Sequence, residues 1–392
     1  MSTISKYSIL LSLEEFGMKV AIVYDRVNKW GGAERVLLAL HKLFPDAPLY
    51  TSVYNNKTAP WAKDFYIRTS LLQKFPLASS AHQLYAALMP IAFESFSFDE
   101  YDLVISVTSE AAKGIITKPK TIHICYCLTP TRYLWSGYDD YFKDNVLRFV
   151  SKPLVSYLRT WDKVAGQRPD VYVAISKEVQ GRIKKYYRRE SVVVYPPVDS
   201  IKYKVLSSKY RNGENKIHDT KYLIPNTGYF LIVSRLVPYK KIDLAISAFN
   251  KLKVPLKIVG NGSEESYLKG ISGKTIEFLG NLTDKELVEY YKGCRCLIFP
   301  GVEDFGLTIL EAQNFGKPVI AFRGGGALEA IIEGKTGLFF DEQTIESLCI
   351  AIEQFNNVTI SSKDCIRNAE KFSFGRFKKE FMKVVKEKLA KH

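Results

Sequence analysis

The segment FPGVEDFGLTILEAQNFGKPVIAFRGGGALEAI, from Phe299 to Ile331, contains two transitions from a strand-like run to a helix-like run. Glu303 lies on the first transition, and Glu311 lies eight positions later, more than one turn inside the helix expected to begin near Gly306. The glycine triplet 324–326 forms the second transition. Apolar strands that alternate with helices in this way predict a parallel α/β sheet.

The same alternation extends over most of the chain. In the first half, strands are predicted at 20–24, 47–53, 103–107, 123–127, 171–176 and 191–196. In the second half they are predicted at 229–236, 256–260, 276–280, 296–300, 318–322 and 337–340. Each half has enough strands for its own open sheet, and ligands of such sheets bind beyond the carboxyl ends of the strands. The predicted fold class is therefore α/β, with two Rossmann-like domains facing each other across a cleft.

Composition shifts place the domain boundaries. Residues 1–17 precede the strand-like KVAIVY and are predicted to be an N-terminal extension, which leaves Met1 and Met18 as alternative starts. Residues 18–200 form the predicted first domain, the polar stretch 201–224 a linker, and residues 225–373 the second domain. Apolar residues at helical spacing predict a C-terminal helix at 374–392, which could cross back to the first domain.

The charge of the chain leaves several partners open. The formal net charge is +15, which is compatible with nucleic acid, anionic lipid or a phosphorylated ligand. Between Tyr141 and Glu190 there are twelve Lys or Arg against five Asp or Glu, a net of +7. This run is either a solvated helix face or a membrane-surface patch. The sequence has no apolar run of eighteen residues, and its start has no basic region before an apolar patch. Neither a spanning helix nor a secretion signal is therefore expected.

The six cysteines predict neither disulfides nor a metal site. Cys125 and Cys127 lie on one expected strand and Cys294 and Cys296 at another, with a spacing that differs from the C-x-x-C of zinc sites. Buried thiols in a reducing compartment are the preferred interpretation. The loop after the first strand lacks the G-x-G-x-x-G pattern, so no nicotinamide cofactor is expected. We expect neither a metal nor another cofactor.

The second half combines groups that suit a sugar diphosphate. The amides around Phe305, Gly306 and Leu307 would lie at a helix N-terminus, which favours an anion. Arg235 and Lys240 follow the strand 229–236, where an Arg fork and a Lys point charge could hold a diphosphate without a metal. Carboxylates accept hydrogen bonds from two vicinal hydroxyls, so the two glutamates would flank a diphosphate that carries a sugar at each end.

These residues carry a family resemblance. Glu303 to Glu311 resembles the E-x7-E motif of retaining GT-B glycosyltransferases of family 4, and SRLVPYK at 234–240 resembles the diphosphate-binding segment of that family. The likeness continues from about Met18 through the blocks 31–40, 123–135, 174–199, 258–270 and 276–287. The segment 303–331 is similar to bacterial mannosyltransferases that build O-antigen, part of lipopolysaccharide, and other surface polysaccharides from GDP-mannose.

The resemblance implies roles for individual residues. Glu303, Arg235 and Lys240 would form the catalytic set, with Glu303 on donor-sugar hydroxyls and the two cations on the diphosphate. A covalent nucleophile role for Glu303 is the less favoured alternative. Donor-binding residues would be Glu311 on the ribose, the amides of Gly306 and Leu307, and also Phe305, Gly325, Gly260, Leu279, Gly31 and Gly32. In a retaining transfer the acceptor hydroxyl enters on the face from which the diphosphate departs, so stabilising the leaving group is the main catalytic requirement.

The first domain contains a departure from the family pattern. Relatives often have C-H-T-P where this chain has Cys127, Leu128, Thr129 and Pro130, and the missing histidine puts the donor sugar or the activity itself in doubt. His123 starts the same strand and is interpreted as a structural residue. The candidate acceptor-binding residues are Arg132, Tyr133 and Trp135.

The predicted function is transfer of a hexose, mannose from GDP-mannose in the first instance, to a saccharide or polyprenyl-linked acceptor. The expected location is cytoplasmic, with possible peripheral contact with the inner membrane through the aromatic and basic stretch 61–93 and the run 141–190. Alternatives are another nucleotide-sugar donor, a weakly active partner subunit that binds nucleotide sugar, and a sugar-nucleotide epimerase. A nucleic-acid-binding protein is suggested by charge alone and lacks any motif, so no nucleic-acid partner is expected.

Overall fold

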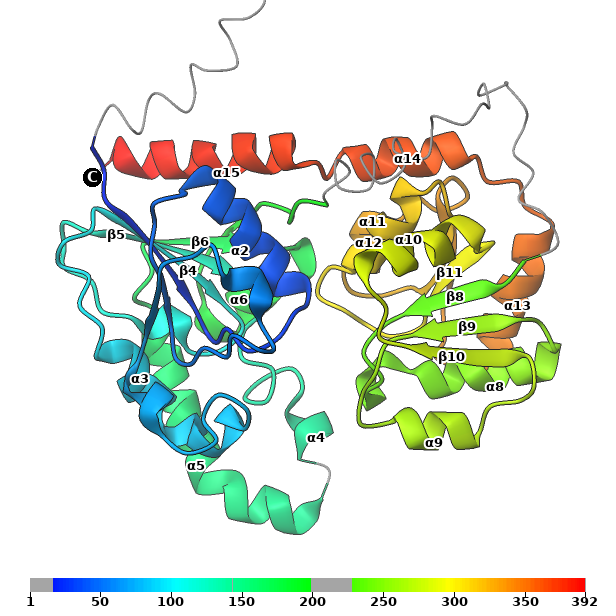
Figure 1. The fold of residues 1–392 in the computed structure, drawn as a ribbon, viewed down its shortest axis with the longest axis horizontal. Helices are drawn as coiled ribbons and strands as arrows, with labels where there is room; N and C mark the ends of the chain where they lie inside the picture. The colour runs from blue at the N-terminus through cyan, green and yellow to red at the C-terminus, as the bar shows by residue number, and fades with distance from the viewer. Residues whose placement is uncertain (1–16, 143, 199–227, 392) are drawn as a thin grey trace, which may run out of the picture. The chain divides into compact units, whose positions relative to one another are not determined.

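A computed structural model of the chain describes residues 17–142, 144–198 and 228–391, which belong to two compact units (Figure 1). The first unit contains residues up to Pro196 and the segment Lys378–His392, and the second contains Pro197–Phe377. The predicted N-terminal extension, apart from Gly17, and the predicted linker lie outside the described residues.

The first unit is built on a seven-stranded sheet with the strand order β3-β2-β1-β4-β5-β6-β7. All neighbouring strands in it are parallel. The strands are β1 (Val20–Tyr24), β2 (Leu49–Thr51), β3 (Ile67–Thr69), β4 (Leu103–Thr108), β5 (Ile122–Cys127), β6 (Val171–Ala174) and β7 (Val192–Val193). Every residue of β4 and β5 is buried, as expected for central strands of a parallel sheet covered by helices on both faces. The sequence did not predict β3, a short edge strand.

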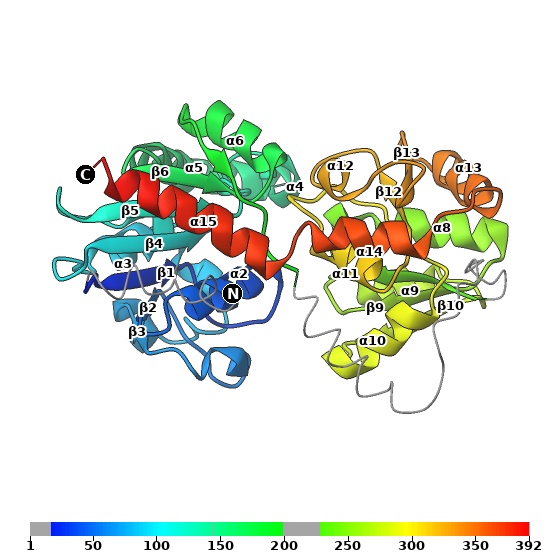
Figure 2. The same ribbon diagram turned by 90° about the horizontal axis from the view of Figure 1, so that it is seen from above.

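Helices and 3₁₀ turns connect these strands. They are α2 (Gly32–Leu43), α3 (Met89–Glu94), α4 (Tyr138–Tyr141), α5 (Asn145–Ala165), α6 (Lys177–Tyr187), η1 (Pro60–Ala62), η2 (Leu71–Lys74), η3 (His82–Leu88) and η4 (Ala112–Gly114). The C-terminal helix α15 (Phe374–Leu389) lies along this sheet, as Figure 2 shows, and its Phe381 ring is 6.3 Å from the ring of Tyr126 on β5.

The second unit has a six-stranded parallel sheet with the order β10-β9-β8-β11-β12-β13. Its strands are β8 (Phe230–Val233), β9 (Leu256–Val259), β10 (Ile276–Gly280), β11 (Cys296–Phe299), β12 (Val319–Phe322) and β13 (Gly337–Phe340). Its helices are η5 (Pro238–Lys240), α8 (Ile242–Leu252), α9 (Glu265–Gly270), α10 (Asp284–Gly293), α11 (Leu307–Asn314), α12 (Ala327–Ala330), α13 (Ile345–Asn356) and α14 (Ser362–Glu370).

Both sheets confirm the predicted class of two Rossmann-like α/β domains, while their placement across a cleft stays a prediction. In each sheet the order of strands reverses beside the first strand, between β1 and β4 and between β8 and β11. Such a switch point leaves a crevice outside the carboxyl ends of the strands, where ligands of open α/β sheets bind. The loops after β8 and β11 carry Arg235, Lys240 and Glu303, so the sequence-predicted catalytic residues lie at the switch point of the second sheet.

Candidate active site

Lys240 and Glu303 form an ion pair between the two loops at this switch point. Lys240 ends the 3₁₀ turn η5, which begins with Pro238 at its first position, and its side chain is almost completely buried. Glu303 stays partly exposed. The pair therefore presents a carboxylate and an ammonium group side by side at the carboxyl edge of the sheet.

Arg235 lies on the same loop and remains exposed. Its guanidinium donates a hydrogen bond of 2.6 Å to the hydroxyl of Tyr239, whose ring centroid is 5.2 Å from Lys240 Nζ. Tyr239 thus holds the two cations of this loop near one another. Two cations on one short loop suit a ligand with two adjacent phosphates.

Helix α11 begins at Leu307, as the sequence predicted, and Gly306 is its N-cap residue. Gly306 has φ +86°, a left-handed conformation that glycine adopts without strain, and a Cβ there would lie 2.9 Å from Ile309 Cδ1. Phe305 is buried against Phe372, with ring centroids 5.6 Å apart. The chain therefore turns sharply from Glu303 into a helix whose first amides are free to bind an anion.

Glu311 is buried inside α11, where it is 2% exposed. Its Oε2 accepts a hydrogen bond of 2.8 Å from the hydroxyl of Tyr291 on α10. The sequence placed Glu311 in the helix correctly but missed Tyr291, which lies twenty positions away on another helix. The tyrosine thus fixes the orientation of this buried carboxylate.

The glycine triplet packs directly against the loop that carries Glu303. The amide of Gly326 donates to the carbonyl of Glu303 at 2.8 Å. A Cβ on Gly325 would lie 2.4 Å from the same carbonyl oxygen, and a Cβ on Gly326 would lie 2.2 Å from Phe305 Cα. Glycine is needed here because the two backbones approach more closely than any side chain allows.

Gly260 directly follows β9, and Leu279 lies near the end of β10. Gly260 has φ +123°, and a Cβ there would lie 1.9 Å from the carbonyl oxygen of Ser234, next to Arg235. Its amide donates to the carbonyl of Gly280 at 2.8 Å. Leu279 precedes Gly280 and is half-buried. Gly260 therefore fixes the loop with the candidate cations against its neighbours in the same sheet.

In the first unit, Gly31 is the N-cap of α2 and Gly32 its first residue. The closest neighbour of a Cβ on Gly31 would be Glu34 Oε2 at 3.1 Å. Glu34 is buried and accepts a hydrogen bond of 2.8 Å from Tyr24, and burial raises the pKa of its carboxyl. The sequence did not reveal this carboxyl group next to the glycine pair.

Asp25, at the end of β1, is a second buried carboxylate that the sequence did not reveal. It accepts hydrogen bonds from the amides of residues 109–112 and from the hydroxyls of Thr108 and Ser109, at 2.7–3.3 Å. Burial raises the pKa of Asp25 and the nearby Glu110 raises it further, although the amide hydrogen bonds oppose the shift. Asp25 thereby fixes the loop after β4, where Glu110 pairs with Arg26 at 2.6 Å.

The candidate acceptor residues Arg132, Tyr133 and Trp135 lie in the loop after β5, and all three are partly exposed. The indole nitrogen of Trp135 donates to Asp162 at 2.8 Å, and its ring stacks on Tyr186 with centroids 5.1 Å apart. Asp162 is buried on α5 and also accepts hydrogen bonds from Thr131, Tyr187 and Lys113. The sequence missed this acidic residue, which anchors the loop from below.

Leu128, where many relatives have histidine, and His123, the nearby histidine of this chain, are both buried. Leu128 is at the end of β5, and its amide donates to the carbonyl of Thr108 at 2.8 Å. His123 is fully buried, with Nε2 2.8 Å from Ser106 Oγ, and burial lowers its pKa to about 3. A neutral, enclosed imidazole agrees with the structural role predicted for His123.

All six cysteines are free and buried, as predicted. The residues that the structure describes contain no group of three or more His, Cys, Asp or Glu arranged to hold a metal ion. Within the same ranges, no helix combines the length and the hydrophobicity needed to cross a bilayer.

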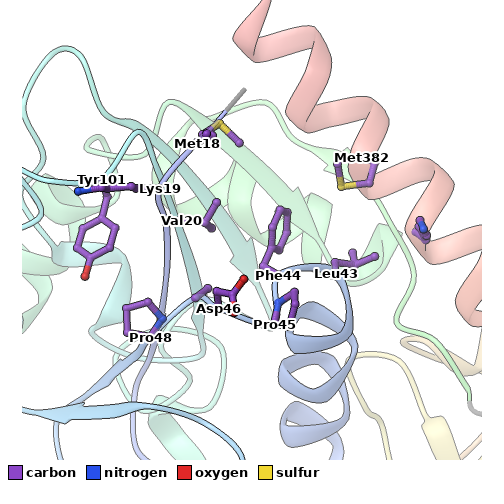
Figure 3. Close-up of a pocket in the computed structure, with 13 residues that line it drawn as sticks. Met18, Lys19, Val20, Leu43, Phe44, Pro45, Asp46, Pro48, Tyr101 and Met382 are labelled. Carbon is purple, nitrogen blue, oxygen red and sulfur yellow. The ribbon is translucent and has the colours of Figure 1, made fainter. Parts of the chain in front are cut away.

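A cavity of about 300 Å³ in the first unit lies away from these residues (Figure 3). It is lined by residues at the start of β1, the loop before β2 and helix α15, including Val20, Phe44, Pro45, Tyr101 and Met382. Because these residues lie at the amino ends of the strands, the cavity is at the opposite edge of the sheet from Gly31. Its mostly apolar lining offers little to a charged diphosphate.

Comparison with protein families places a known domain on the second unit. Residues 214–372 match the family described as "Glycosyl transferases group 1". The match covers less than half of the chain and assigns a glycosyltransferase group 1 domain to the part that contains Arg235, Lys240 and Glu303.

Two curated relatives are mannosyltransferases. Alpha-1,3/1,6-mannosyltransferase ALG2 of Dictyostelium discoideum is 28% identical over 428 residues, which cover 95% of this chain and 99% of that protein. O-antigen chain mannosyltransferase C of Escherichia coli is 25% identical over 238 residues, which cover 58% of this chain and 60% of that protein. The chain thus spans less than two thirds of some of the curated relatives it matches.

A solved structure is similar to the whole described fold. Anabaena Alr3699/HepE in complex with UDP-glucose has a TM-score of 0.67 and 20% identity, covering 94% of this chain and 100% of that chain. This likeness shows the GT-B fold class, with two Rossmann-like domains.

Proposed function

We propose that this protein is a retaining glycosyltransferase that transfers mannose from GDP-mannose to a lipid-linked saccharide in the synthesis of a surface polysaccharide. The observation that carries the proposal is the Lys240–Glu303 ion pair at the switch point of a glycosyltransferase group 1 domain. The 28% identity to a mannosyltransferase over nearly the whole chain supports the sugar, and the O-antigen relative supports the polysaccharide.

The donor would exchange the contacts of this ion pair. Its diphosphate would take Lys240 and Arg235, together with the first amides of α11, while the sugar hydroxyls would take the carboxylate of Glu303. The pair keeps both side chains at the carboxyl edge of the sheet before the donor binds, and binding would replace the contact between them by contacts with the donor. No metal would be required for this arrangement, because two cations and a helix N-terminus would face the diphosphate.

Transfer would then proceed on one face of the sugar. The bond between the anomeric carbon and the diphosphate oxygen breaks, and the acceptor hydroxyl oxygen forms a bond with the same carbon from the same side. The hydroxyl proton passes to an oxygen of the departing diphosphate. Lys240 and Arg235 stabilise the negative charge that develops there, and Glu303 orients the sugar.

Two alternatives have specific support. The similar Anabaena structure contains UDP-glucose, which makes another nucleotide sugar the first alternative donor. Leu128, in place of the histidine of many relatives, makes a weakly active subunit that binds nucleotide sugar the second. Restoring histidine with Leu128→His should raise turnover if the enzyme lacks only this group, and should leave turnover unchanged in a binding subunit.

Calorimetric titration tests the donor site directly. GDP, UDP, ADP and their common sugar conjugates are titrated into the unmodified protein, Lys240→Ala and Lys251→Ala. The last is a control because Lys251 is an exposed lysine of the same unit, on α8. Preference for GDP and GDP-mannose that is lost in Lys240→Ala alone supports the proposal. Equal binding of all nucleotides, or no effect of Lys240→Ala, contradicts it.

A further inference from the structure

Helix α5 has apolar side chains on two faces, one buried and one exposed. Val155 and Leu158 are buried and pack with Leu134 in a small core beneath the loop after β5. The other face carries exposed apolar side chains, and besides Val164 (56% exposed) near the end of the helix there are five in its first part. They are Val146 (71% exposed), Phe149 (79%), Val150 (69%), Leu154 (39%) and Tyr157 (48%).

The spacing of these residues makes them one continuous stripe. Positions 146, 149, 150, 154 and 157 follow intervals of three and four, which places them on one side of a helix. At 100° per residue, Val146, Phe149, Val150 and Tyr157 point away from Val155 and Leu158, while Leu154, one turn before Leu158, lies at the border between the two faces. In Figure 1 the first turns of α5 project beyond the rest of the first unit, so the stripe lies on a protruding element. Exposed apolar groups gathered in this way mark a binding surface.

The charges on the same helix indicate what covers the stripe. The charged side chains at the surface of the described part of α5 are all cations: Lys152 and Lys163 are exposed, Arg148 and Arg159 are partly exposed, and the acidic residue Asp162 is buried. These cations share one flank between the exposed stripe and the buried face. Two acidic residues lie near the start of this flank. Asp139 on α4 forms an ion pair with Arg148, and Asp144 lies just before the helix. A helix with an apolar face and a cationic flank is typical of segments that lie in the surface of an anionic bilayer.

The cationic flank leads to the candidate acceptor loop. Lys163 Nζ lies 5.6 Å from the ring centroid of Trp135 and Arg159 Cζ lies 5.7 Å from it. Trp135 stacks on Tyr186, over whose ring Lys185 lies at 5.4 Å. Aromatic rings surrounded by lysine and arginine suit the boundary between lipid tails and anionic headgroups.

We propose that α5 is the membrane-docking element of this protein, with Val146, Phe149 and Val150 inserted among the acyl chains of an anionic bilayer. The cationic flank then rests on the headgroups, and the loop 132–135 lies at the bilayer surface. This inference rests on the proposed function in one respect: a lipid-linked acceptor would reach that loop without leaving the membrane.

Vesicle flotation tests the docking. The full-length protein is mixed with vesicles of neutral phosphatidylcholine or with vesicles that contain one quarter phosphatidylglycerol. The variants are Phe149→Ser/Val150→Ser for the stripe and Lys152→Glu for the flank. Ile350→Ser/Val358→Ser is the matched control, because it removes two exposed apolar side chains from the second unit. The substituted side chains are exposed, so each variant should fold, and thermal unfolding checks this.

We expect the unmodified protein to bind the anionic vesicles, with at least tenfold weaker partitioning in the stripe variant and no change in the control. Lys152→Glu should weaken binding to anionic vesicles more than to neutral ones. Absence of binding to either vesicle overturns the proposal, as does equal binding by the stripe variant. If light scattering shows that the stripe variant converts a dimer to a monomer without changing vesicle binding, the stripe is a surface for self-association and the proposal is wrong.

Nucleotide titration without vesicles separates this inference from the proposed function. The stripe variant should bind GDP-mannose as the unmodified protein does, because α5 belongs to the first unit and Lys240 to the second. Docking without nucleotide binding would leave the membrane element intact and refute the glycosyltransferase proposal. Nucleotide binding without docking would do the reverse.

Discussion

Lys113 and Asp162 form an ion pair inside the first unit, with Nζ 2.6 Å from Oδ1 and both side chains 1% exposed. Burial by itself lowers the pKa of Lys113, but the Asp162 carboxylate outweighs this effect and the net shift is upward. The pair joins the loop after β4 to helix α5, and its carboxylate also holds Thr131 and Trp135. A buried pair of this kind adds little net stability, but removing one partner leaves the other charge buried without compensation.

We predict that Trp135→Phe weakens acceptor binding through this network. The substitution keeps the ring stack on Tyr186 but removes the indole hydrogen bond to Asp162. Three other donors still satisfy the carboxylate, so the free energy of unfolding should fall by only about 1 kcal/mol. The KM for the acceptor should rise severalfold while the KM for the donor stays constant. Steady-state kinetics with each substrate varied in turn measures both.

Trp161→Phe is the matched control for Trp135→Phe. It also removes an indole hydrogen bond to a carboxylate, that of Glu94, at 2.7 Å. A similar rise in acceptor KM in both variants would mean that the effect is general loosening of the first unit. Asp162→Asn should be far more damaging, with a loss of about 3–5 kcal/mol, because it leaves the Lys113 ammonium buried without its counter-charge.

A second prediction concerns the close approach of two backbones beside Glu303. Gly326→Ala would place a Cβ 2.2 Å from Phe305 Cα, so the loop that carries Glu303 must move. We expect GDP-mannose affinity to fall at least tenfold by calorimetry. Gly270→Ala, where a Cβ would meet nothing within 4 Å, should leave affinity unchanged. Unchanged affinity in Gly326→Ala would show that the loop is not part of the donor site.

The sequence predicted most of the described strands because central strands of a parallel sheet are continuous apolar runs. It missed β3, where Arg68 interrupts the run and all three residues are at least partly exposed. Arg235, Lys240 and Glu303 were also accessible to sequence reasoning, since each follows an apolar strand and topology alone brings such loops together.

The buried carboxylates Asp25 and Asp162 could not be identified from the sequence in the same way. The partners of Asp25 are 83–87 positions away, and Asp162 is 49 positions from Lys113. No local pattern links residues so far apart. A charged residue directly after a strand, as at Asp25, was the available signal, and it does not distinguish a buried anchor from a solvated loop.

A third prediction tests the role of Glu311. Tyr291→Phe removes the hydroxyl that donates to Glu311 at 2.8 Å and leaves the ring stacked on Phe315. If Glu311 binds the ribose, calorimetry should show a three- to tenfold weaker affinity for GDP, while inorganic pyrophosphate, which has no ribose, should bind as before. Tyr229→Phe loses a comparable hydrogen bond to a carbonyl and serves as the control. Equal weakening of GDP and pyrophosphate would exclude a specific ribose contact.

Two buried histidines make the first unit sensitive to acid. Burial lowers the pKa of His82 to about 4, with a further decrease from Arg26 and Lys29 that Asp25 partly opposes. Burial also lowers the pKa of His123 to about 3, where Asp170 opposes the shift and Arg168 and Arg189 add to it. His82 Nδ1 lies 3.4 Å from the side-chain nitrogen Nδ2 of Asn28, and a neutral ring can accept a hydrogen bond from this group. Both imidazoles are therefore neutral in the folded protein at pH 5.

The fourth prediction follows from the sign of these shifts. An unfolded histidine has a pKa of about 6.5, so between pH 6.5 and 4 the unfolded chain binds more protons and stability falls as pH falls. Each histidine should cost about 2 kcal/mol between pH 7 and pH 5. Urea unfolding at both pH values, followed through a probe in the first unit, measures the decrease in the free energy of unfolding from pH 7 to pH 5. This decrease should be smaller in His82→Gln than in the unmodified protein by about this amount. The raised pKa values of Asp25 and Glu34 act in the opposite direction, but they are common to both proteins and cancel in the comparison. An equal acid loss in His82→Gln and in the unmodified protein would show that this imidazole is already protonated in the folded state.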